Sequence, residues 1–367
     1  CGQPALYNEA GFQSSLAAFF PEIPKEDLSK FNGGGCTETM LAGVSNVGSL
    51  DAGINLPLIF SHCMREGLGE CADFSEFYSL LLAKIKEETV STLRILNDFR
   101  KKRALFLPQP VRTLLIDDCI DKALDFNAGG ARYSWSVVNF AGLVNVIDSL
   151  LAIRELIYDR KSYTPTDFIA ALDSNDQLFR ARARCCACFG NDDPNADSLA
   201  ADFTEKVFRI LDAQTPYLGS RFLASSIQFV TYVDAGRCVP ATPDGRSAGE
   251  PLADSIGAIS GKDKNGPTAL INSVSRLPLG LAAGTPVFNL RLQKRFLGES
   301  LKKLISVFFA RGGMQVQITC VSREELEDAV LHPEKHGGLI VRVGGYSEYF
   351  NRLSPELRKT VLERTEY

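Results

Sequence analysis

Strand-like segments alternate with helices in the last part of the chain, and this alternation limits the fold more than any other feature. Residues 227–233 and 314–321 are rich in β-branched and apolar side chains, and Gly/Pro-rich loops and a helical pattern at 300–309 separate them. A further strand is expected at 339–343. Such alternation is typical of folds in which helices cover a mostly parallel sheet. The sequence therefore predicts an α/β fold.

The middle of the chain is expected to be mainly helical, and the segment 1–75 to be rich in loops. Residues 75–103 carry apolar side chains at helical spacing along one long helix. Shorter helical patterns cover residues 112–126, 137–158, 165–173, 175–188 and 196–213. Since the sequence contains no internal repeat and no long linker, we expect a single unit over 1–367, helical at 75–213 and α/β at 220–367.

Composition and charge exclude several classes of protein. With 45% hydrophobic and 23% charged residues, the chain can build a large core. A net charge of −4 without runs of like charge gives no footprint for nucleic acid or an anionic membrane. The most apolar stretch, 137–153, is short for a membrane span and predicts a buried helix. No basic-then-apolar leader is present, so we expect a cytoplasmic protein.

Ten cysteines are scattered along the chain without a repeating spacing. In a long chain this distribution predicts reduced thiols rather than a disulfide framework. Cys185, Cys186 and Cys188 form one cluster, but none of the three histidines has ligand spacing to it. We therefore expect buried core thiols there and no metal site.

Two adjacent glycines, Gly344 and Gly345, follow the last predicted strand. Glycine tolerates positive φ, so such a pair most often marks a bend. Upstream, Ser322 and Glu325 form a capping box that predicts a helix, and a final helix is expected to begin after Ser354. The glycines would then lie on a strand-to-helix loop, where α/β proteins often keep functional residues.

Several blocks of sequence resemble one family in its own order. The segment HPEKHGGLIVRVGGYSEYFNRLSPELRKTVLERTEY resembles the C-terminal signature of the glycyl radical enzymes, which include pyruvate formate-lyase and the radical diol dehydratases. The segment FNGGGCTETMLAGVSNVGSLDAGINLPLIF, in the region 1–60, resembles the cysteine loop of that family. The blocks GGARYSWSVVNFAGLVNVIDSLLAIRELIYDRKSYT, ATPDGRSAGEPLADSIGA and GPTALINSVSRLPLGLAAGTPVFNLRL are also similar. The resemblance thus spans nearly the whole chain.

The resemblance assigns three catalytic roles. Gly345 takes the position of the radical glycine, Cys36 that of the thiyl cysteine, and Glu38 that of the acid/base glutamate. A backbone Cα radical needs a near-planar carbon, and a side chain would strain that geometry. Cys36 is expected to relay the unpaired electron from Gly345 to a substrate carbon, while Glu38 exchanges protons with the substrate.

The same resemblance favours radical elimination, by dehydration or by cleavage of a C–N or C–S bond in a small polar substrate. Formate acetyltransferases use two neighbouring cysteines, whereas Gly35 precedes Cys36 here. A glycyl radical decarboxylase or C–C lyase stays open, because some of these enzymes also carry Gly-Cys-x-Glu. A non-catalytic scaffold is a remote alternative, since the chain retains Cys36, Glu38 and Gly345.

Candidate substrate contacts come from two blocks that resemble pocket-forming parts of the family. They are Tyr133, Ser134 and Trp135 in the first block, and Thr285, Phe288 and Asn289 in the second. For the aromatic residues, packing in the core is an equally good interpretation.

The resemblance also implies partners and a larger architecture. Family members are longer, and their N-terminal part supplies half of a ten-stranded α/β barrel in which the cysteine and glycine loops meet. This chain starts at Cys1, just before the cysteine loop, so we expect the C-terminal half-barrel, completed by a missing N-terminal segment or a separate chain. A radical S-adenosylmethionine activating enzyme would install the radical on Gly345, so no bound cofactor is expected. A homodimer is also expected.

Overall fold

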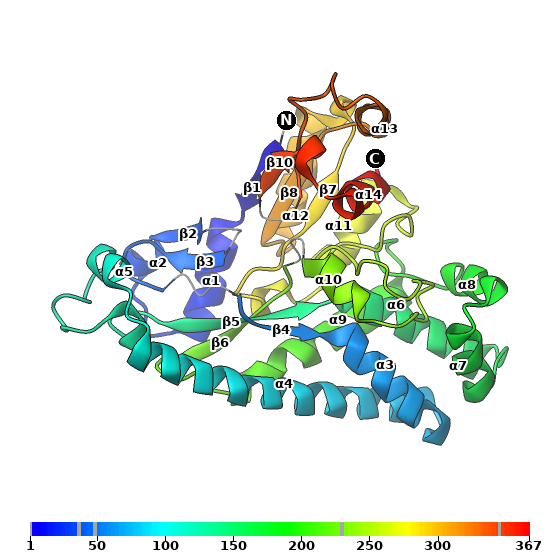
Figure 1. Ribbon diagram of the computed structural model, residues 1–367, viewed down its shortest axis with the longest axis horizontal. Coiled ribbons are helices and arrows are strands. Elements are labelled where there is room, and N and C mark those ends of the chain that lie inside the picture. The colour runs from blue at the N-terminus through cyan, green and yellow to red at the C-terminus, as the bar shows by residue number, and fades with distance from the viewer. Residues whose placement is uncertain (1, 35–37, 47–49, 228–230, 344–345) are drawn as a thin grey trace.

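The computed structural model describes residues 2–34, 38–46, 50–227, 231–343 and 346–367 (Figure 1). The strands are β1 (Gly2–Tyr7), β2 (Phe31–Gly34), β3 (Glu38–Leu41), β4 (Leu50–Asn55), β5 (Trp135–Ala141), β6 (Arg221–Ser225), β7 (Asn289–Arg291), β8 (Gln315–Thr319), β9 (Ile340–Arg342) and β10 (Ser347–Tyr349). The longer helices are α1 (Glu9–Phe19), α3 (Leu56–Gly67), α4 (Phe74–Phe106), α6 (Leu143–Ile153), α7 (Pro165–Asp173), α8 (Gln177–Arg184), α9 (Pro194–Arg209), α11 (Gly266–Arg276), α12 (Glu299–Ala310), α13 (Arg323–Leu331) and α14 (Pro355–Glu363). The shorter helices are α2 (Lys25–Leu28), α5 (Pro110–Leu115) and α10 (Thr231–Arg237).

Five parallel strands follow one another in chain order within the described part of the molecule. β4, β5 and β6 form one parallel sheet, and β7 and β8 are parallel in a second sheet. A parallel bridge between Ser226 and Pro286 joins the end of β6 to the segment that enters β7. β1 then pairs antiparallel with β8, where Ala5 lies opposite Gln317. The predicted α/β fold is confirmed, and helices cover the outside of both sheets (Figure 1).

The central strand and the helix after it were predicted as one helix, and this prediction is wrong for residues 137–141. All seven residues of β5 are buried, so the strand shows no alternation of apolar and polar residues. A buried strand and a buried helix cannot be told apart by such a pattern. Gly142, with φ of 71°, separates β5 from α6, and every residue of α6 is buried.

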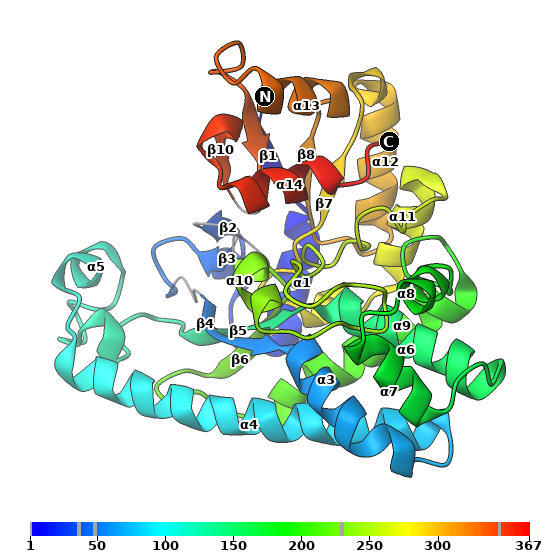
Figure 2. The same cartoon turned by 45° about the vertical axis from the view of Figure 1, so that its right-hand side comes forward.

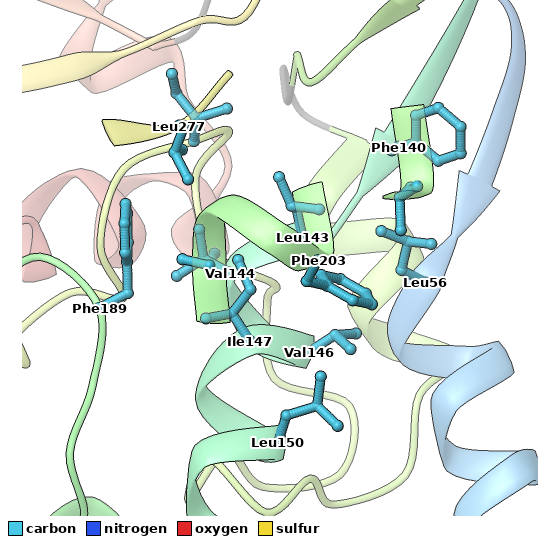
Figure 3. Close-up of a cluster of buried hydrophobic side chains, with 14 of the residues drawn as sticks. Leu56, Phe140, Leu143, Val144, Val146, Ile147, Leu150, Phe189, Phe203 and Leu277 are labelled. Carbon is cyan, nitrogen blue, oxygen red and sulfur yellow. The ribbon is translucent and has the colours of Figure 1, made fainter. Parts of the chain in front are cut away.

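The main core lies between the β4–β5–β6 sheet and the helices that cover it. Leu143, Val144 and Ile147 of α6 project into this core beside Phe203 of α9 (Figure 3). α3 packs against both α4 and α6. The 33-residue α4 runs along one side of the molecule beneath the sheet (Figure 1). The long helix predicted at 75–103 is therefore confirmed.

Helix caps confirm several predicted boundaries. Ser322 Oγ accepts a hydrogen bond from Glu325 N at 3.2 Å, as expected for the start of α13. Ser354 Oγ accepts one from Leu357 N at 3.3 Å at the start of α14. α7 has the predicted bounds. Each of these helices begins where a serine or threonine oxygen pairs with a free backbone N–H group.

Four other predictions about local structure are wrong. A helix was expected at 112–126, but α5 ends at Leu115 and turns follow it. A strand was expected at 227–233, but β6 ends at Ser225 and α10 begins at Thr231. The segment 1–75 is not mainly loops, because it holds α1, α3 and the strands β1 to β4. β9 is followed by its antiparallel partner β10 and not by a helix, and the predicted glycine pair between these strands lies outside the described residues.

The C-terminal hairpin and helices form a second, smaller core. Val341, Val343 and Phe350 pack there with Tyr232 and Leu252. β10, α13 and α14 gather in this upper part of the molecule, near both chain ends (Figures 1 and 2). The β9–β10 hairpin lies against β1 and β8, so it is joined to the sheet edge.

An exposed apolar surface covers the last turns of α4, α5 and the turns that follow. Its members are all at least 57% exposed: Ile95, Phe99, Leu105, Phe106, Leu107, Val111, Leu114, Leu115 and Ile120. We call this set the α4–α5 surface. Monomeric soluble proteins seldom leave so many large apolar side chains uncovered in one place.

The cysteine cluster is only partly buried. Cys186 lies in the main core, Cys188 is partly buried, and Cys185 is exposed, so the prediction of three core thiols is wrong for Cys185. Within the described ranges, no group of three or more His, Cys, Asp and Glu side chains is arranged to hold a metal ion. In the same ranges, no helix combines the length and the apolar character needed to cross a bilayer.

Candidate functional site

The β2–β3 hairpin carries Glu38. The two strands pair antiparallel, and Gly34 lies opposite Glu38. The glutamate is buried, with 7% of its surface exposed. Cys36, the candidate relay cysteine between these strands, lies outside the described residues. The structure therefore describes the two strands that support the predicted cysteine loop and, of the three predicted catalytic residues, Glu38.

The surroundings of Gly33 show why glycine is needed at one position of the glycine-rich segment before Cys36. A Cβ atom added at Gly33 would overlap the ring of Tyr7 in β1, far inside van der Waals contact. That ring also packs against Phe12 and Phe31, with centroids 6.0 Å apart in each pair. The hairpin thus lies directly on β1, and β1 contacts the C-terminal hairpin through β9. The two hairpins that carry the predicted catalytic residues therefore flank one strand.

Glu38 has an unusual environment for a buried acid. Among the described residues, no atom donates a hydrogen bond to its Oε2, although that oxygen is shielded from solvent. Buried polar atoms are nearly always paired, because an unpaired one loses its hydration without compensation. A carboxylate oxygen in this state is suited to accept a proton or a hydrogen bond from a bound molecule.

Thr285 is the candidate contact that reaches this hairpin directly. Its hydroxyl oxygen lies 3.1 Å from that of Thr39, the residue after Glu38, and both residues are buried. Thr285 has a φ of 102°, a strained conformation for a β-branched residue. Strained backbone of this kind is concentrated at functional sites. Thr39 was not predicted from the sequence, and its position next to Glu38 is the signal that could have found it.

Tyr133, in the first block of candidate substrate contacts, is hydrogen-bonded to a residue of α2. The Tyr133 hydroxyl donates to Asp27 Oδ2 at 2.7 Å. Lys30 and Tyr133, together with Arg132, hold the pKa of Asp27 down at about 2. Burial, and then Asp27, raises the pKa of Tyr133 to about 12. These contacts fix Tyr133 as part of a polar cluster around α2.

Ser134 and Trp135 also make structural contacts. The Ser134 carbonyl accepts hydrogen bonds from both the amide and the hydroxyl of Ser220, each at 2.9 Å. Trp135 is fully buried and packs against Phe20, with ring centroids 5.6 Å apart. No hydrogen bond or ion pair in the described part of the chain joins either residue to Glu38.

Phe288 and Asn289 lie at the start of the second sheet. Phe288 is fully buried against Phe308, with ring centroids 5.4 Å apart. Asn289 Nδ2 donates to Asp254 Oδ1 at 2.8 Å. Asp254 belongs to a block of sequence that resembles the family, but its partner could not be predicted, because the contact joins a loop residue to a strand residue 35 positions away in the sequence.

The strand that leads to Gly345 is buried. Val341 and Val343 are both fully buried in the second core. Arg342 Nε donates to Gln317 Oε1 of β8 at 2.6 Å, which attaches the hairpin to the sheet. Gly345 itself lies outside the described residues. The structure therefore places its immediate support deep in the fold.

Comparisons with known proteins cover the whole chain. A family described as "Pyruvate formate lyase-like" matches residues 1–236, and one described as "Glycine radical" matches residues 252–351. The chain is 27% identical, over its full length and 49% of the relative, to trans-4-hydroxy-L-proline dehydratase of Clostridioides difficile. It is 31% identical, over 72% of its length and 33% of the relative, to an isethionate sulfite-lyase of Oleidesulfovibrio alaskensis.

A decarboxylase and the solved structure of a dehydratase are also similar to this chain. An indoleacetate decarboxylase of Tractidigestivibacter scatoligenes is 28% identical over the full chain and 47% of the relative. The solved structure of the glycerol-bound B12-independent glycerol dehydratase from Clostridium butyricum covers the full chain with a TM-score of 0.94 and 28% identity. The chain matches 49% of that structure, and it spans about half the length of the relatives it matches throughout.

Proposed function

Because this chain belongs to the pyruvate formate lyase-like family and carries a glycine radical segment, we propose that it is the catalytic half of a glycyl radical lyase. Gly345 stores the radical, Cys36 relays it and Glu38 acts as acid and base. The reaction is an elimination, by loss of water or by cleavage of a C–N or C–S bond in a small polar substrate. The dehydratase and sulfite-lyase among the relatives support this class of reaction.

In the proposed reaction, hydrogen atoms and one proton pass between Gly345, Cys36, Glu38 and the substrate. Cys36 gives its thiol hydrogen atom to Gly345 and becomes a thiyl, which takes a hydrogen atom from a substrate carbon. Glu38 accepts the proton of the hydroxyl group on that carbon, which promotes departure of the neighbouring leaving group. Glu38 then returns its proton to the leaving group. The product radical takes back a hydrogen atom from Cys36, and the thiyl regains its hydrogen from Gly345.

The observation that carries this proposal is the buried, unpartnered Oε2 of Glu38 within the described part of the chain. A surface or salt-bridged glutamate would have water or a cation at that oxygen. Thr285, hydrogen-bonded to the next residue, is the candidate contact we retain beside it. The contacts of Tyr133, Trp135 and Phe288 favour packing roles for these three aromatic residues.

A second candidate reaction is decarboxylation or C–C cleavage by the same radical relay. The similarity to an indoleacetate decarboxylase favours it. The two reactions differ in their products, because decarboxylation releases carbon dioxide and elimination releases water, an amine or sulfite. Assays of activated protein against candidate arylacetates and small polyols or hydroxy acids therefore separate them.

We further propose that a second half, supplied by another segment or another chain, completes the fold. The five parallel strands in chain order would form half of a ten-stranded barrel. The α4–α5 surface is apolar and exposed, as expected for a surface that another part of the fold covers. The longer relatives have enough additional chain to supply such a part.

The experiment that tests the function is anaerobic activation of the complete protein with a radical S-adenosylmethionine activating enzyme. We expect a glycine-centred doublet in electron paramagnetic resonance and its loss in Gly345→Ala. The Cys36→Ser variant should keep the doublet but lose turnover, because serine cannot relay the hydrogen atom. A doublet that persists in Gly345→Ala would contradict the assignment of the radical.

A further inference from the structure

Arg364 follows α14 and reaches back to the strand that leads to Gly345. Its Nη1 donates to the carbonyl oxygen of Arg342 at 2.6 Å, and its Nη2 donates to the carbonyl oxygen of Val343. Nη2 also lies 2.7 Å from Asp254 Oδ2. One guanidinium group thus donates hydrogen bonds to two consecutive backbone carbonyls and forms an ion pair with one carboxylate, whose Oδ2 accepts no hydrogen bond within the described residues.

The group is well shielded from solvent. The side chain of Arg364 is 10% exposed and that of Asp254 is 16% exposed. Arginine suits such a place because its planar, rigid fork presents several donors at fixed angles. A desolvated ion pair adds little net stability, since burial of both charges offsets their attraction. The arrangement is therefore better explained by the geometry that it imposes.

Asp254 is held in turn by groups of the sheet region. Its Oδ1 accepts a hydrogen bond from Asn289 Nδ2 at 2.8 Å and another from Ser255 Oγ at 3.2 Å. Asn289 is the first residue of β7, one of the parallel strands. A continuous set of contacts therefore runs from the sheet through Asp254 and Arg364 to the backbone just before the glycine pair.

We propose that Arg364 and Asp254 are positioning residues that set the place of the radical-bearing glycine relative to the relay cysteine. This inference rests on the proposed function of Gly345, which stands two residues beyond Val343. Hydrogen-atom transfer between two heavy atoms needs near contact, and a displacement of about 1 Å can cost about 100-fold in rate. Fixing the carbonyls of residues 342 and 343 restrains the chain immediately before the reacting carbon.

The test compares three variants of the complete, anaerobically activated protein. Arg364→Gln removes the clamp, and Asp254→Asn removes the charge that orients it. Arg358→Gln is the matched control, because Arg358 lies in the adjoining α14 and also donates to two backbone carbonyls, those of Leu353 and Asn351, each at 2.9 Å. The measured quantities are glycyl radical spins per protein and substrate turnover per spin.

We expect Arg364→Gln and Asp254→Asn to lower turnover per spin by about 10- to 100-fold, while Arg358→Gln leaves it unchanged. A merely structural role would lower the amount of folded protein or the number of spins, but not turnover per spin. Wild-type turnover per spin in Arg364→Gln would overturn the inference. If that variant carries no radical, wild-type turnover per spin in Asp254→Asn overturns it instead.

A second measurement needs no radical. Amide hydrogen exchange at residues 340–347 should quicken in Arg364→Gln and stay unchanged in Arg358→Gln, because only the first substitution frees the carbonyls of residues 342 and 343. Unchanged exchange in both variants would also refute the clamp. If the proposed function itself is wrong, the wild-type protein will give no doublet that depends on Gly345. The two failures can therefore be told apart.

Discussion

Glu38 and Asp27 are both buried acids, and the structure predicts opposite results when each carboxylate is changed to an amide. Asp27 accepts hydrogen bonds from Lys30, Arg132 and Tyr133. Glu38 Oε2 has no donor among the described residues. The comparison of Glu38→Gln with Asp27→Asn therefore separates an acid kept for chemistry from an acid kept for stability.

The magnitude for Asp27 follows from its pKa. Its partners lower that pKa from 3.8 to about 2, and each unit corresponds to about 1.4 kcal/mol. Asp27→Asn should therefore lower the free energy of unfolding at pH 7 by about 2 kcal/mol. Glu38→Gln breaks no hydrogen bond at Oε2, so the free energy of unfolding should change by less than about 1 kcal/mol.

The two variants should also differ in activity. Loss of a general acid and base costs about 10²- to 10⁴-fold in rate, so Glu38→Gln should lower turnover per glycyl radical spin by that factor while the number of spins is kept. Urea unfolding at pH 7 gives the stabilities, and anaerobic assays with spin counting give the turnover. The reasoning is refuted if Glu38→Gln unfolds as easily as Asp27→Asn, or if it retains wild-type turnover.

Four smaller predictions follow from the same contacts. The pKa of Asp27 is lower in the folded state, so its stabilising effect is complete above the unfolded value of 3.8. The free energy of unfolding should therefore fall by about 2 kcal/mol as the pH is lowered from 3.8 towards 2, and this loss should be absent in Asp27→Asn. Tyr133→Phe should cost about 1 kcal/mol in urea unfolding through the lost hydrogen bond, with unchanged substrate affinity. Gly33→Ala should cost about 1–3 kcal/mol through overlap with Tyr7, seen as a lower unfolding midpoint. Phe106→Ser, at a side chain that is 74% exposed, should reduce self-association of this chain in light scattering, and an unchanged particle size would contradict the exposed apolar surface.

Local signals in the sequence were enough to predict the long helices and their caps. The α4 helix has a clear apolar periodicity, and Ser322 and Ser354 are side chains that pair with backbone N–H groups nearby. The strand at 135–141 was missed because it is buried on both faces and therefore shows no periodicity. The hairpin at β9 and β10 was missed because β10 is very short and its partner defines it.

The candidate site was predictable where it depends on motifs, and not where it depends on tertiary contacts. Glu38 stands in a recognisable glycine-rich segment, and its burial agrees with an enclosed site. Thr39 and Arg364 lie within segments that resemble the family, but their contacts could not be predicted. Thr39 pairs with Thr285, and Arg364 pairs with a backbone carbonyl that precedes α14 in the sequence. Such contacts appear only when distant segments meet in the folded chain.

The pairing of β1 with β8 bears on how the protein is made. Ala5 leaves the ribosome long before Gln317, its partner in the sheet, because nearly the whole chain separates the two. At about 5–20 residues per second, the first strand waits roughly 15–60 s with its hydrogen-bonding edge unpaired. During that time Tyr7 has no strand to hold it over Gly33, so the cysteine hairpin lacks its support. Nascent chains should therefore depend on chaperones at least until residue 317 has left the ribosome.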